Sequence, residues 1–387
     1  MIDSGKIAAL TNWLIAGAPP KQSFSDLVGE IGRRLVAAGM QADHFSLYQV
    51  MIHPEMPGQF YYWTKAGGSR HMVFSTAFMK NSDSWIGTPP QICMTSGRLV
   101  VHTLGSAPDF DGWTIAIKYG ESGYRQFVYT PLHSRYSLAA SVASYGSKAP
   151  QGFSAEELHI LRQIQAPMAR ITEAFVLHEG TVQVLSTYVG RGAGQRVLQG
   201  NILRGDAEII PSIVLFTDLK NFTALSNSRP ASEVMETLNS FYDVAETAIV
   251  GNGGEVLKFM GDGLLAIFPT PDDLSAQLAA ASGAITALEE TRAALIKAGR
   301  TDIQFRAALH LGDIHYGNIG SKSRLDFTAI GPTVNLAARL MPAADEFGAE
   351  TVCSEVFHRL IPGQTALLGE RQFKGFESPQ QIYRVSA

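Results

Sequence analysis

The order of strand-like and helix-like segments after Ala207 constrains the fold more than any other feature of this sequence. Apolar runs of strand length alternate there with segments of helical periodicity, and two of the runs flank Gly261-Asp-Gly263, a hairpin signal. The segments are, in order, a strand at 209–216, a helix at 234–249, strands at 255–260 and 264–268, a long Ala-rich helix at about 273–298, a strand pair near 305–310 and 314–319, and a helix at roughly 333–341. This β-α-β-β-α-β order favours a ferredoxin-like α+β sandwich.

The region before it, residues 20–178, has the pattern of strands flanked by helices. A helix is expected from about Ser25, because Leu27, Ile31 and Leu35 fall four residues apart and a glycine follows. Turns that contain Gly and Pro separate the strand-length runs, which are Phe45 to Ile52, Phe60 to Lys65, His71 to Thr76, Gln126 to Tyr129 and Ser137 to Tyr145. Ser154-Ala-Glu-Glu157 is a capping box that opens an amphipathic exit helix.

These patterns predict three parts in the 387-residue chain. Residues 1–178 would form an N-terminal helix and an α/β domain with an antiparallel sheet. Residues 179–206, punctuated by glycines, would be a linker, and residues 207–387 a second domain. Gly317-Asn-Ile-Gly-Ser-Lys-Ser323 does not fit a phosphate loop and is expected to be the turn of a β-arm.

Composition excludes several classes of protein. Lys and Arg total 31 and Asp and Glu total 35, so the net charge of −4 argues against a chain that coats nucleic acid. Two cysteines, Cys93 and Cys353, cannot form a disulfide framework or a cysteine-based zinc site. No apolar run reaches the roughly 18 residues that span a bilayer. The apolar segment from Ile7 to Ala18 follows Asp3 and is expected to be a short amphipathic helix rather than a removed signal, which favours a cytoplasmic protein.

Leu215-Phe-Thr-Asp218-Leu-Lys-Asn-Phe-Thr223 places a carboxylate at the end of a buried strand, just before a short helix. Free N–H groups at the start of a helix bind anions, so a cation-binding carboxylate beside them suits a metal–polyphosphate complex. The alternative is that Asp218 only caps the helix.

Lys258-Phe-Met-Gly-Asp262-Gly places a second carboxylate at a hairpin tip. If that tip lies beside the end of the first strand, Asp218 and Asp262 could share a pair of Mg²⁺ or Mn²⁺ ions, which prefer oxygen ligands. The alternative is an ordinary Asp-Gly turn.

Arg324-Leu-Asp-Phe-Thr328-Ala-Ile-Gly-Pro-Thr-Val-Asn335-Leu-Ala-Ala-Arg339-Leu carries two polar groups on one helix face. Asn335 and Arg339 are four residues apart, and an amide beside a guanidinium suits a sugar and a phosphate oxygen. The alternative is an ordinary exposed helix face.

Together, the three segments resemble the catalytic domain of class III nucleotidyl cyclases over roughly residues 207–387. The resemblance implies that Asp218 and Asp262 hold two metal ions, with the Leu219 carbonyl as an additional ligand. It implies that the ribose 3′-hydroxyl attacks the α-phosphate of a nucleoside triphosphate. Asn335 would orient the ribose, and Arg339 would stabilise the charge that develops on the phosphate.

The same resemblance indicates ATP as the substrate. Adenylyl cyclases of the family have a Lys at the position of Lys258, where it would donate to adenine N1, and Thr328 occupies the partner position, as in one bacterial subgroup. Guanylyl cyclase activity and a non-catalytic nucleotide-binding module are the alternatives. Further triphosphate contacts are expected from the segment after the first strand and from a loop near the C-terminus, namely Lys220, Asn221, Phe222, Thr223 and Lys374. In this family each site is built across a dimer, so the resemblance implies a homodimer.

The N-terminal part resembles a GAF-type sensor domain in its order of elements and its exit helix. Such domains bind small molecules or dimerise, and we expect an unidentified ligand here. Cys93 as a bilin attachment site and His53 or His71 as haem ligands lack the surrounding motifs, so each is interpreted as structural. The linker is expected to couple this sensor to the relative angle of two catalytic domains.

Overall fold

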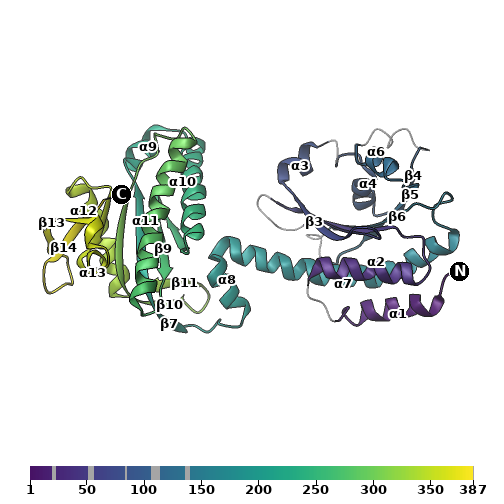
Figure 1. The fold of residues 1–387 in the computed structure, drawn as a ribbon, viewed down its shortest axis with the longest axis horizontal. Helices are drawn as coiled ribbons and strands as arrows, with labels where there is room; N and C mark the ends of the chain where they lie inside the picture. Colours follow the sequence, from purple (N-terminus) through teal and green to yellow (C-terminus); the bar gives the residue numbers. More distant parts are fainter. Residues whose placement is uncertain (20–22, 51–55, 83–84, 106–113, 136–139, 387) are drawn as a thin grey trace. The chain divides into compact units, whose positions relative to one another are not determined.

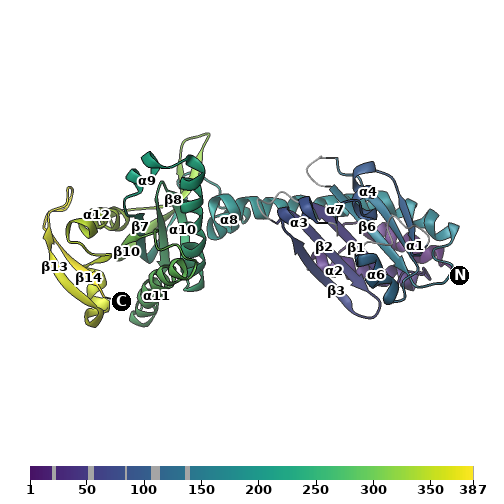
Figure 2. The ribbon, with the colours of Figure 1, turned by 90° about the horizontal axis from the view of Figure 1, so that it is seen from above.

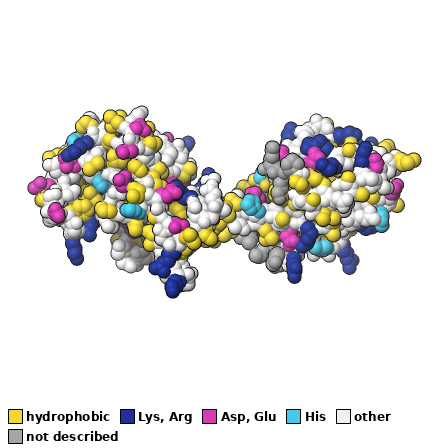
Figure 3. Space-filling view, turned by 90° about the horizontal axis from the view of Figure 1, so that it is seen from below, with side chains coloured by type: hydrophobic (Ala, Val, Ile, Leu, Met, Phe, Trp, Pro, Cys, Tyr) yellow, Lys and Arg dark blue, Asp and Glu magenta, His cyan; other side chains and the backbone are white. Residues whose placement is uncertain are grey.

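A computed structural model describes residues 1–19, 23–50, 56–82, 85–105, 114–135 and 140–386 (Figure 1). The chain divides into two compact units, Met1–Val184 and Leu185–Ala387. On the face shown in Figure 3, acidic, basic and hydrophobic side chains are interspersed over each unit. Within the described ranges, no helix is both long enough and apolar enough to cross a membrane.

The N-terminal unit is built on a six-stranded antiparallel sheet in the order β3-β2-β1-β6-β5-β4. Its strands are β1 (His44–Val50), β2 (Gly58–Thr64), β3 (Gly68–Phe74), β4 (Val100–Thr103), β5 (Gln126–Leu132) and β6 (Ala140–Ser147). Its helices are α1 (Ser4–Ile15), α2 (Phe24–Ala37), α3 (Thr76–Asn81), α4 (Pro89–Ser96), α6 (Thr114–Glu121) and α7 (Ala155–Val189). Figures 1 and 2 show α1, α2 and α7 on one side of the sheet and α3, α4 and α6 on the other.

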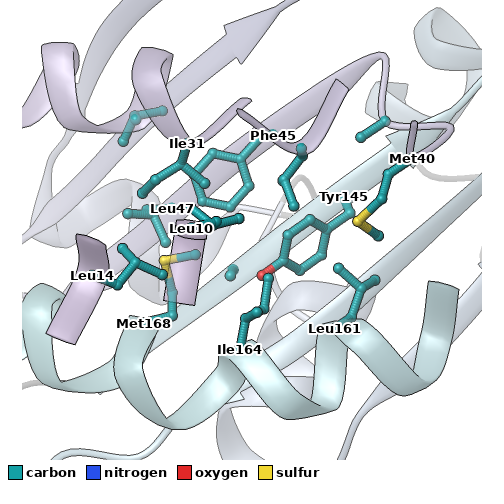
Figure 4. Close-up of a cluster of buried hydrophobic side chains, with 14 of the residues drawn as sticks. Leu10, Leu14, Ile31, Met40, Phe45, Leu47, Tyr145, Leu161, Ile164 and Met168 are labelled. Carbon is teal, nitrogen blue, oxygen red and sulfur yellow. The ribbon is translucent and has the colours of Figure 1, made fainter. Parts of the chain in front are cut away.

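Side chains that alternate along each strand of this sheet point to opposite faces, where they join two separate hydrophobic cores. Phe45 and Leu47 of β1 pack with Tyr145 of β6 against the helices of one face, where Ile31 and Leu161 are fully buried (Figure 4). The next residues along each strand face α3, α4 and α6 and form a second, aromatic cluster. This alternation is the period-2 pattern of a strand buried on both faces.

The predicted antiparallel sheet with flanking helices is therefore confirmed, whereas the GAF assignment stays a prediction. The predicted helix from Ser25 is α2, capped by Ser23, whose hydroxyl accepts from the amide of Asp26 at 3.1 Å. The capping box is also present, since the amide of Glu157 donates to Ser154 Oγ at 3.2 Å. Parts of two predicted strands, residues 51–52 and 137–139, and His53 lie outside the described residues.

The C-terminal unit has an eight-stranded sheet whose central strands lie in the order β10-β7-β9-β8, all antiparallel. Its strands are β7 (Ala207–Leu219), β8 (Glu255–Met260), β9 (Gly263–Pro269), β10 (Phe305–Gly320), β11 (Leu325–Ile330), β12 (Thr351–Ser354), β13 (Thr365–Arg371) and β14 (Gln380–Val385). Its helices are α8 (Arg191–Leu198), α9 (Phe222–Ser228), α10 (Ala231–Gly251), α11 (Leu274–Lys297), α12 (Pro332–Glu346) and α13 (Glu355–Leu360). With α10 and α11 as connections, the central strands confirm the ferredoxin-like order.

Helices cover both faces of this sheet. Phe241 of α10 and Leu288 of α11 pack on one face with Phe305. Leu336 and Leu340 of α12 pack on the other. The burial of both faces explains why β7 and β9 are continuous apolar runs rather than alternating ones.

Of three further sequence predictions about this unit, two need correction and one is confirmed. The strand pair expected at 305–310 and 314–319 is one long strand, β10, because β7 pairs with it without interruption from Phe305 to Gly317. The expected β-arm is confirmed, because β10 and β11 pair on either side of a turn at residues 321–324, which overlaps the predicted turn at 317–323. The connector at 179–206 is largely helical, since it contains the end of α7 and the whole of α8.

Candidate active site

Strand register brings two carboxylates together at one end of the central sheet. Asp218 is the penultimate residue of β7 and pairs with Gly263, the first residue of β9. Asp262 lies in the turn immediately before it, and the Asp262 carbonyl accepts from the Leu219 amide at 3.2 Å. The two side chains are partly buried, and their carboxyl groups are within hydrogen-bonding reach. The sequence prediction that a strand end and a hairpin tip meet here agrees with this geometry.

The two glycines around Asp262 have separate physical roles. Gly261 has a φ of 69°, in the left-handed region that favours glycine. A Cβ on Gly263 would lie 2.0 Å from the carbonyl oxygen of Thr217, so only glycine allows β7 and β9 to approach this closely. The hydroxyl of Tyr242 in α10 donates to the Gly261 carbonyl at 2.7 Å and holds the turn. The hairpin is therefore fixed on both sides of Asp262.

The electrostatics of this pair favour a bound cation. Burial and the adjacent Asp262 carboxylate raise the pKa of Asp218 above its usual range, and Arg306 on β10 opposes that shift. Two carboxylates that repel each other are stabilised by a divalent ion between them. No cluster of three or more His, Cys, Asp or Glu able to hold a metal occurs in the described part of the chain. A metal here would therefore need backbone or substrate oxygens as additional ligands, which fits the expected Leu219 carbonyl and a triphosphate.

The segment after Asp218 contributes mainly backbone groups. Asn221 has a φ of 61° and precedes the seven-residue helix α9. Phe222 packs against the hydrophobic core, and the Lys220 ammonium lies 3.4 Å from Glu350. Lys220 therefore interacts with Glu350, and Phe222 can offer a ligand only its amide. Lys374 is exposed between β13 and β14.

Asn335 and Arg339 lie on one face of α12, and their side chains have no hydrogen bond or ion pair with any residue that the structure describes. The start of this helix is anchored at the middle of β10, where Thr333 Oγ1 donates to the Asp313 carbonyl at 2.6 Å. Its other end approaches the carboxylates, since Asp345 lies 2.8 Å from Arg306. Ten residues of helix separate Asn335 from Asp345, which is about 15 Å at 1.5 Å per residue. Within one chain, the structure does not bring Asn335 to the two carboxylates.

Lys258 lies beside β11. Its ammonium pairs with Asp326, two residues before Thr328 on that strand and hence on the same face. The structure thus brings Lys258 to the strand of its predicted partner. Asp326 was not predicted as a site residue, although its spacing of two from Thr328 was a usable signal.

Large apolar side chains are exposed on the two strands that carry Lys258 and Thr328. On β8 they are Phe259 and Met260, and on β11 they are Leu325 and Ile330, with exposures between 38% and 48%. Exposed large apolar side chains are candidates for burial in a protein–protein interface.

The linker helix α8 docks on the eight-stranded sheet through side chains that were not predicted to act there. Arg196 pairs with Glu208 at 2.5 Å and stacks over the ring of Tyr316, with 5.2 Å between its guanidinium carbon and the ring centroid. The Tyr316 hydroxyl donates to Glu255 on β8 at 3.0 Å. Asn318 Nδ2 donates to the Asn201 carbonyl at 2.8 Å. A displacement of α8 would therefore change the contacts that Tyr316 makes with β8 and that Asn318 makes on β10.

Comparison with known proteins identifies the domain that carries these groups. Residues 209–378 match the family described as the adenylate and guanylate cyclase catalytic domain. Adenylate cyclase 1 of Rhizobium meliloti is 28% identical over 177 residues, which are 44% of this chain and 27% of that relative. The chain thus matches little more than a quarter of that protein.

Two solved structures are also similar. The adenylyl cyclase CyaB from P. aeruginosa is 27% identical with a TM-score of 0.41, and the match covers 47% of this chain and 96% of that chain. The guanylyl cyclase Cya2 is 26% identical with a TM-score of 0.39, and the match covers 46% and 93%. The family match confirms the predicted cyclase catalytic domain over residues 209–378.

Proposed function

We propose that the adenylate and guanylate cyclase catalytic domain at residues 209–378 converts ATP to 3′,5′-cyclic AMP and pyrophosphate. The observation that carries the proposal is the pair of adjacent carboxylates, Asp218 and Asp262, in a domain whose α12 presents the Asn335 and Arg339 side chains without a partner among the described residues. This combination supplies cation ligands, a ribose-orienting amide and a phosphate-binding guanidinium, which are the groups that an intramolecular phosphoryl transfer needs.

The raised pKa of Asp218 supports two divalent ions, Mg²⁺ or Mn²⁺, as cofactors held by Asp218, Asp262 and the Leu219 carbonyl. When bound, such ions lower the pKa of a coordinated hydroxyl and neutralise charge on a triphosphate. Tyr242 and the two glycines of the turn keep Asp262 in position before any ligand arrives, so little reorganisation is needed on binding.

The chain's own polar groups would orient the nucleotide. The Asn335 amide would hydrogen-bond the ribose and keep the 3′-hydroxyl in line with the α-phosphorus. Arg339 would donate to the α-phosphate as negative charge grows there. Backbone amides of Asn221, Phe222 and Thr223 would contact the triphosphate, with Lys220 and Lys374 as additional cations.

Lys258 and Thr328 would select adenine. The Lys258 ammonium can only donate, so it suits adenine N1, an acceptor, and is badly matched to guanine N1, which carries a hydrogen. The Thr328 hydroxyl can accept from the adenine amino group. Asp326 supports this role because its ion pair with Lys258 restricts where that ammonium can point.

A homodimer would complete each site. Since about 15 Å of helix separates Asn335 from the end of α12 near Asp218, we infer that the carboxylates of one chain act with Asn335 and Arg339 of a second copy. The exposed apolar residues of β8 and β11 support this interface. We further propose that the N-terminal unit is a cytoplasmic GAF-like sensor, whose ligand alters activity through α8.

The test is an assay of the purified full chain with ATP or GTP in the presence of Mg²⁺ or Mn²⁺, with cyclic nucleotide and pyrophosphate both measured. We expect cyclic AMP and an equal amount of pyrophosphate, and their loss in Asp262→Asn. Asp272→Asn, a change at an exposed carboxylate outside the site, is the matched control and should retain activity. Cyclic GMP as the main product would overturn the ATP assignment, and no cyclic nucleotide under any of these conditions would refute the enzymatic proposal.

A further inference from the structure

A large cavity lies in the N-terminal unit, on the face of the sheet opposite the core of Figure 4. Its volume is about 850 Å³, and β1, β2, β3, α3 and α6 contribute to its walls. The strand register aligns the lining, because Tyr48 pairs with Phe60 and Phe60 with Met72 across three strands. Protein interiors rarely leave voids much larger than a water molecule, whereas small-molecule sites occupy about 300–1,000 Å³. The cavity therefore has the dimensions of a ligand site.

Aromatic side chains make up about half of the residues that line it. They include Tyr48, Phe60, Tyr62, Phe74, Trp85 and Tyr119. Neighbouring rings already form a layered surface, since Phe60 and Tyr62 have centroids 5.2 Å apart and ring planes only 20° from parallel. Such surfaces favour flat aromatic ligands, which stack on the ring faces or meet them edge-on.

His44 is the polar group at the base of this aromatic wall. Its side chain is 2% exposed, and neither ring nitrogen has a hydrogen-bond partner among the residues that the structure describes. Its ring neighbours are aromatic, with Phe127 at 5.5 Å and Tyr119 at 5.7 Å between centroids. Burial lowers its pKa to about 3, so at neutral pH the ring offers one donor and one acceptor. A buried imidazole left without partners costs free energy, and a ligand that hydrogen-bonds to it would recover that cost.

The charges around the cavity favour an anion. Three exposed lysines line it, Lys65, Lys118 and Lys148, against one carboxylate, Asp43. Asp43 already accepts from the backbone amide of Lys148 at 2.9 Å. Neither Lys65 nor Lys118 has an ion pair with any described residue. An aromatic wall alone would also suit an organic cation, but these lysines would repel one.

We propose that this cavity binds a planar aromatic organic acid, whose rings stack on the aromatic wall, whose polar group hydrogen-bonds to His44 and whose acidic group faces Lys65 and Lys118. The proposal rests on the N-terminal unit alone and does not depend on the cyclase activity. It gives the ligand expected for the sensor a chemical class and a set of contacts.

Two fluorescent probes that share one skeleton test the proposal on the full chain. 8-Anilinonaphthalene-1-sulfonate has fused rings, an N–H group and a sulfonate, and N-phenyl-1-naphthylamine is the same molecule without the sulfonate. All four tryptophans precede residue 185 and Trp85 lines the cavity, so energy transfer from tryptophan that falls in Trp85→Phe reports binding there. We expect the sulfonate probe to bind at least tenfold more tightly than the neutral probe.

Variants separate the contacts. Lys118→Met should weaken the sulfonate probe about fivefold and leave the neutral probe unchanged, whereas Lys80→Met, an exposed lysine of α3 outside the cavity, should change neither. His44→Phe keeps an aromatic ring and removes both nitrogens, so it should weaken both probes severalfold without lowering the thermal transition.

Three results would overturn the proposal. They are the absence of energy transfer to either probe, equal affinity of the two probes, and loss of affinity in Lys80→Met as large as in Lys118→Met. Unchanged affinity of both probes in a folded His44→Phe variant would remove His44 from the site and contradict the proposed contact. Since Lys118 is exposed, its variant should fold in any case.

Discussion

Replacing Gly263 by alanine tests whether the close approach of β7 and β9 creates the carboxylate pair. The new Cβ would lie 2.0 Å from the Thr217 carbonyl oxygen, whereas Cβ atoms are essentially never closer than 3.0 Å to such an atom. The two strands must therefore separate by roughly 1 Å at the residue that pairs with Asp218. Overpacking of this kind costs about 1–3 kcal/mol of stability, and a displacement near 1 Å at a reacting centre costs on the order of 10²-fold in rate.

Gly251→Ala is the matched control for this change. Gly251 is the last residue of α10, has no positive φ, and a Cβ there would meet nothing within 4 Å. Alanine at such a position should be neutral or stabilise the fold by up to about 1 kcal/mol.

Thermal unfolding of the C-terminal unit can be followed separately from that of the N-terminal unit. All four tryptophans, at positions 13, 63, 85 and 113, precede residue 185, so a far-ultraviolet circular dichroism transition without a fluorescence counterpart belongs to the C-terminal unit. We expect Gly263→Ala to lower that transition by roughly 2–12 °C, taking about 2–4 °C per kcal/mol for a unit of this size, and to lower cyclase activity about a hundredfold. A Gly263→Ala protein that matches Gly251→Ala in both measurements would refute the reasoning.

Three further predictions follow from named charges. Asp326→Asn should remove the ion pair that restrains Lys258 and lower kcat/KM for ATP by up to about fivefold, the size expected for a half-exposed ion pair. Glu355→Gln, which removes a surface ion pair on α13, is the control and should leave kcat/KM unchanged. Because the pKa of Asp218 is raised in the folded state, its ionisation destabilises the metal-free fold as pH rises. Asp218→Asn should therefore raise the melting temperature measured by circular dichroism at pH 7 without metal. Added Mn²⁺, at a hundred times its Kd for the wild type, should stabilise the wild type by about 2.7 kcal/mol and leave the variant unchanged. The pKa of His44 is lowered to about 3, so the unfolded chain binds a proton that the folded unit does not, and stability is lost as pH falls below about 6.5. The loss by pH 5 should be about 2 kcal/mol in urea unfolding followed by tryptophan fluorescence and absent in His44→Phe; equal losses in both proteins would contradict it.

The sequence could predict the core topology of the C-terminal unit because each strand there is a continuous apolar run and each helix has a clear period. It could also predict that Asp218 and Asp262 meet, since a hairpin tip and a strand end are fixed by short-range register. It could not predict that β10 continues past His310 as one strand. A break was expected between residues 310 and 314, where the structure instead packs Thr333 of α12 against Gly312.

Contacts between distant segments were the main limit on prediction of the site. The ion pair of Lys258 with Asp326 joins residues 68 positions apart in the sequence. Arg196 stacks over the ring of Tyr316, and the sequence around Tyr316 predicts only an ordinary strand residue. The aromatic cavity was hidden for a similar reason. His44 and Tyr48 alternate with core residues along β1, and nothing in the sequence distinguishes the face that encloses a cavity from the face that packs helices.

The central claim, that each catalytic site takes its carboxylates from one chain and its Asn335 from another, is tested most directly by mixing two inactive proteins. Asp262→Ala and Asn335→Ala homodimers should each lack activity, and subunit exchange should give a mixture with about a quarter of wild-type activity, because half of the dimers then hold one intact site of two. Recovered cyclic nucleotide formation near that level would support the account. An active wild type together with a fully exchanged but inactive mixture would contradict it.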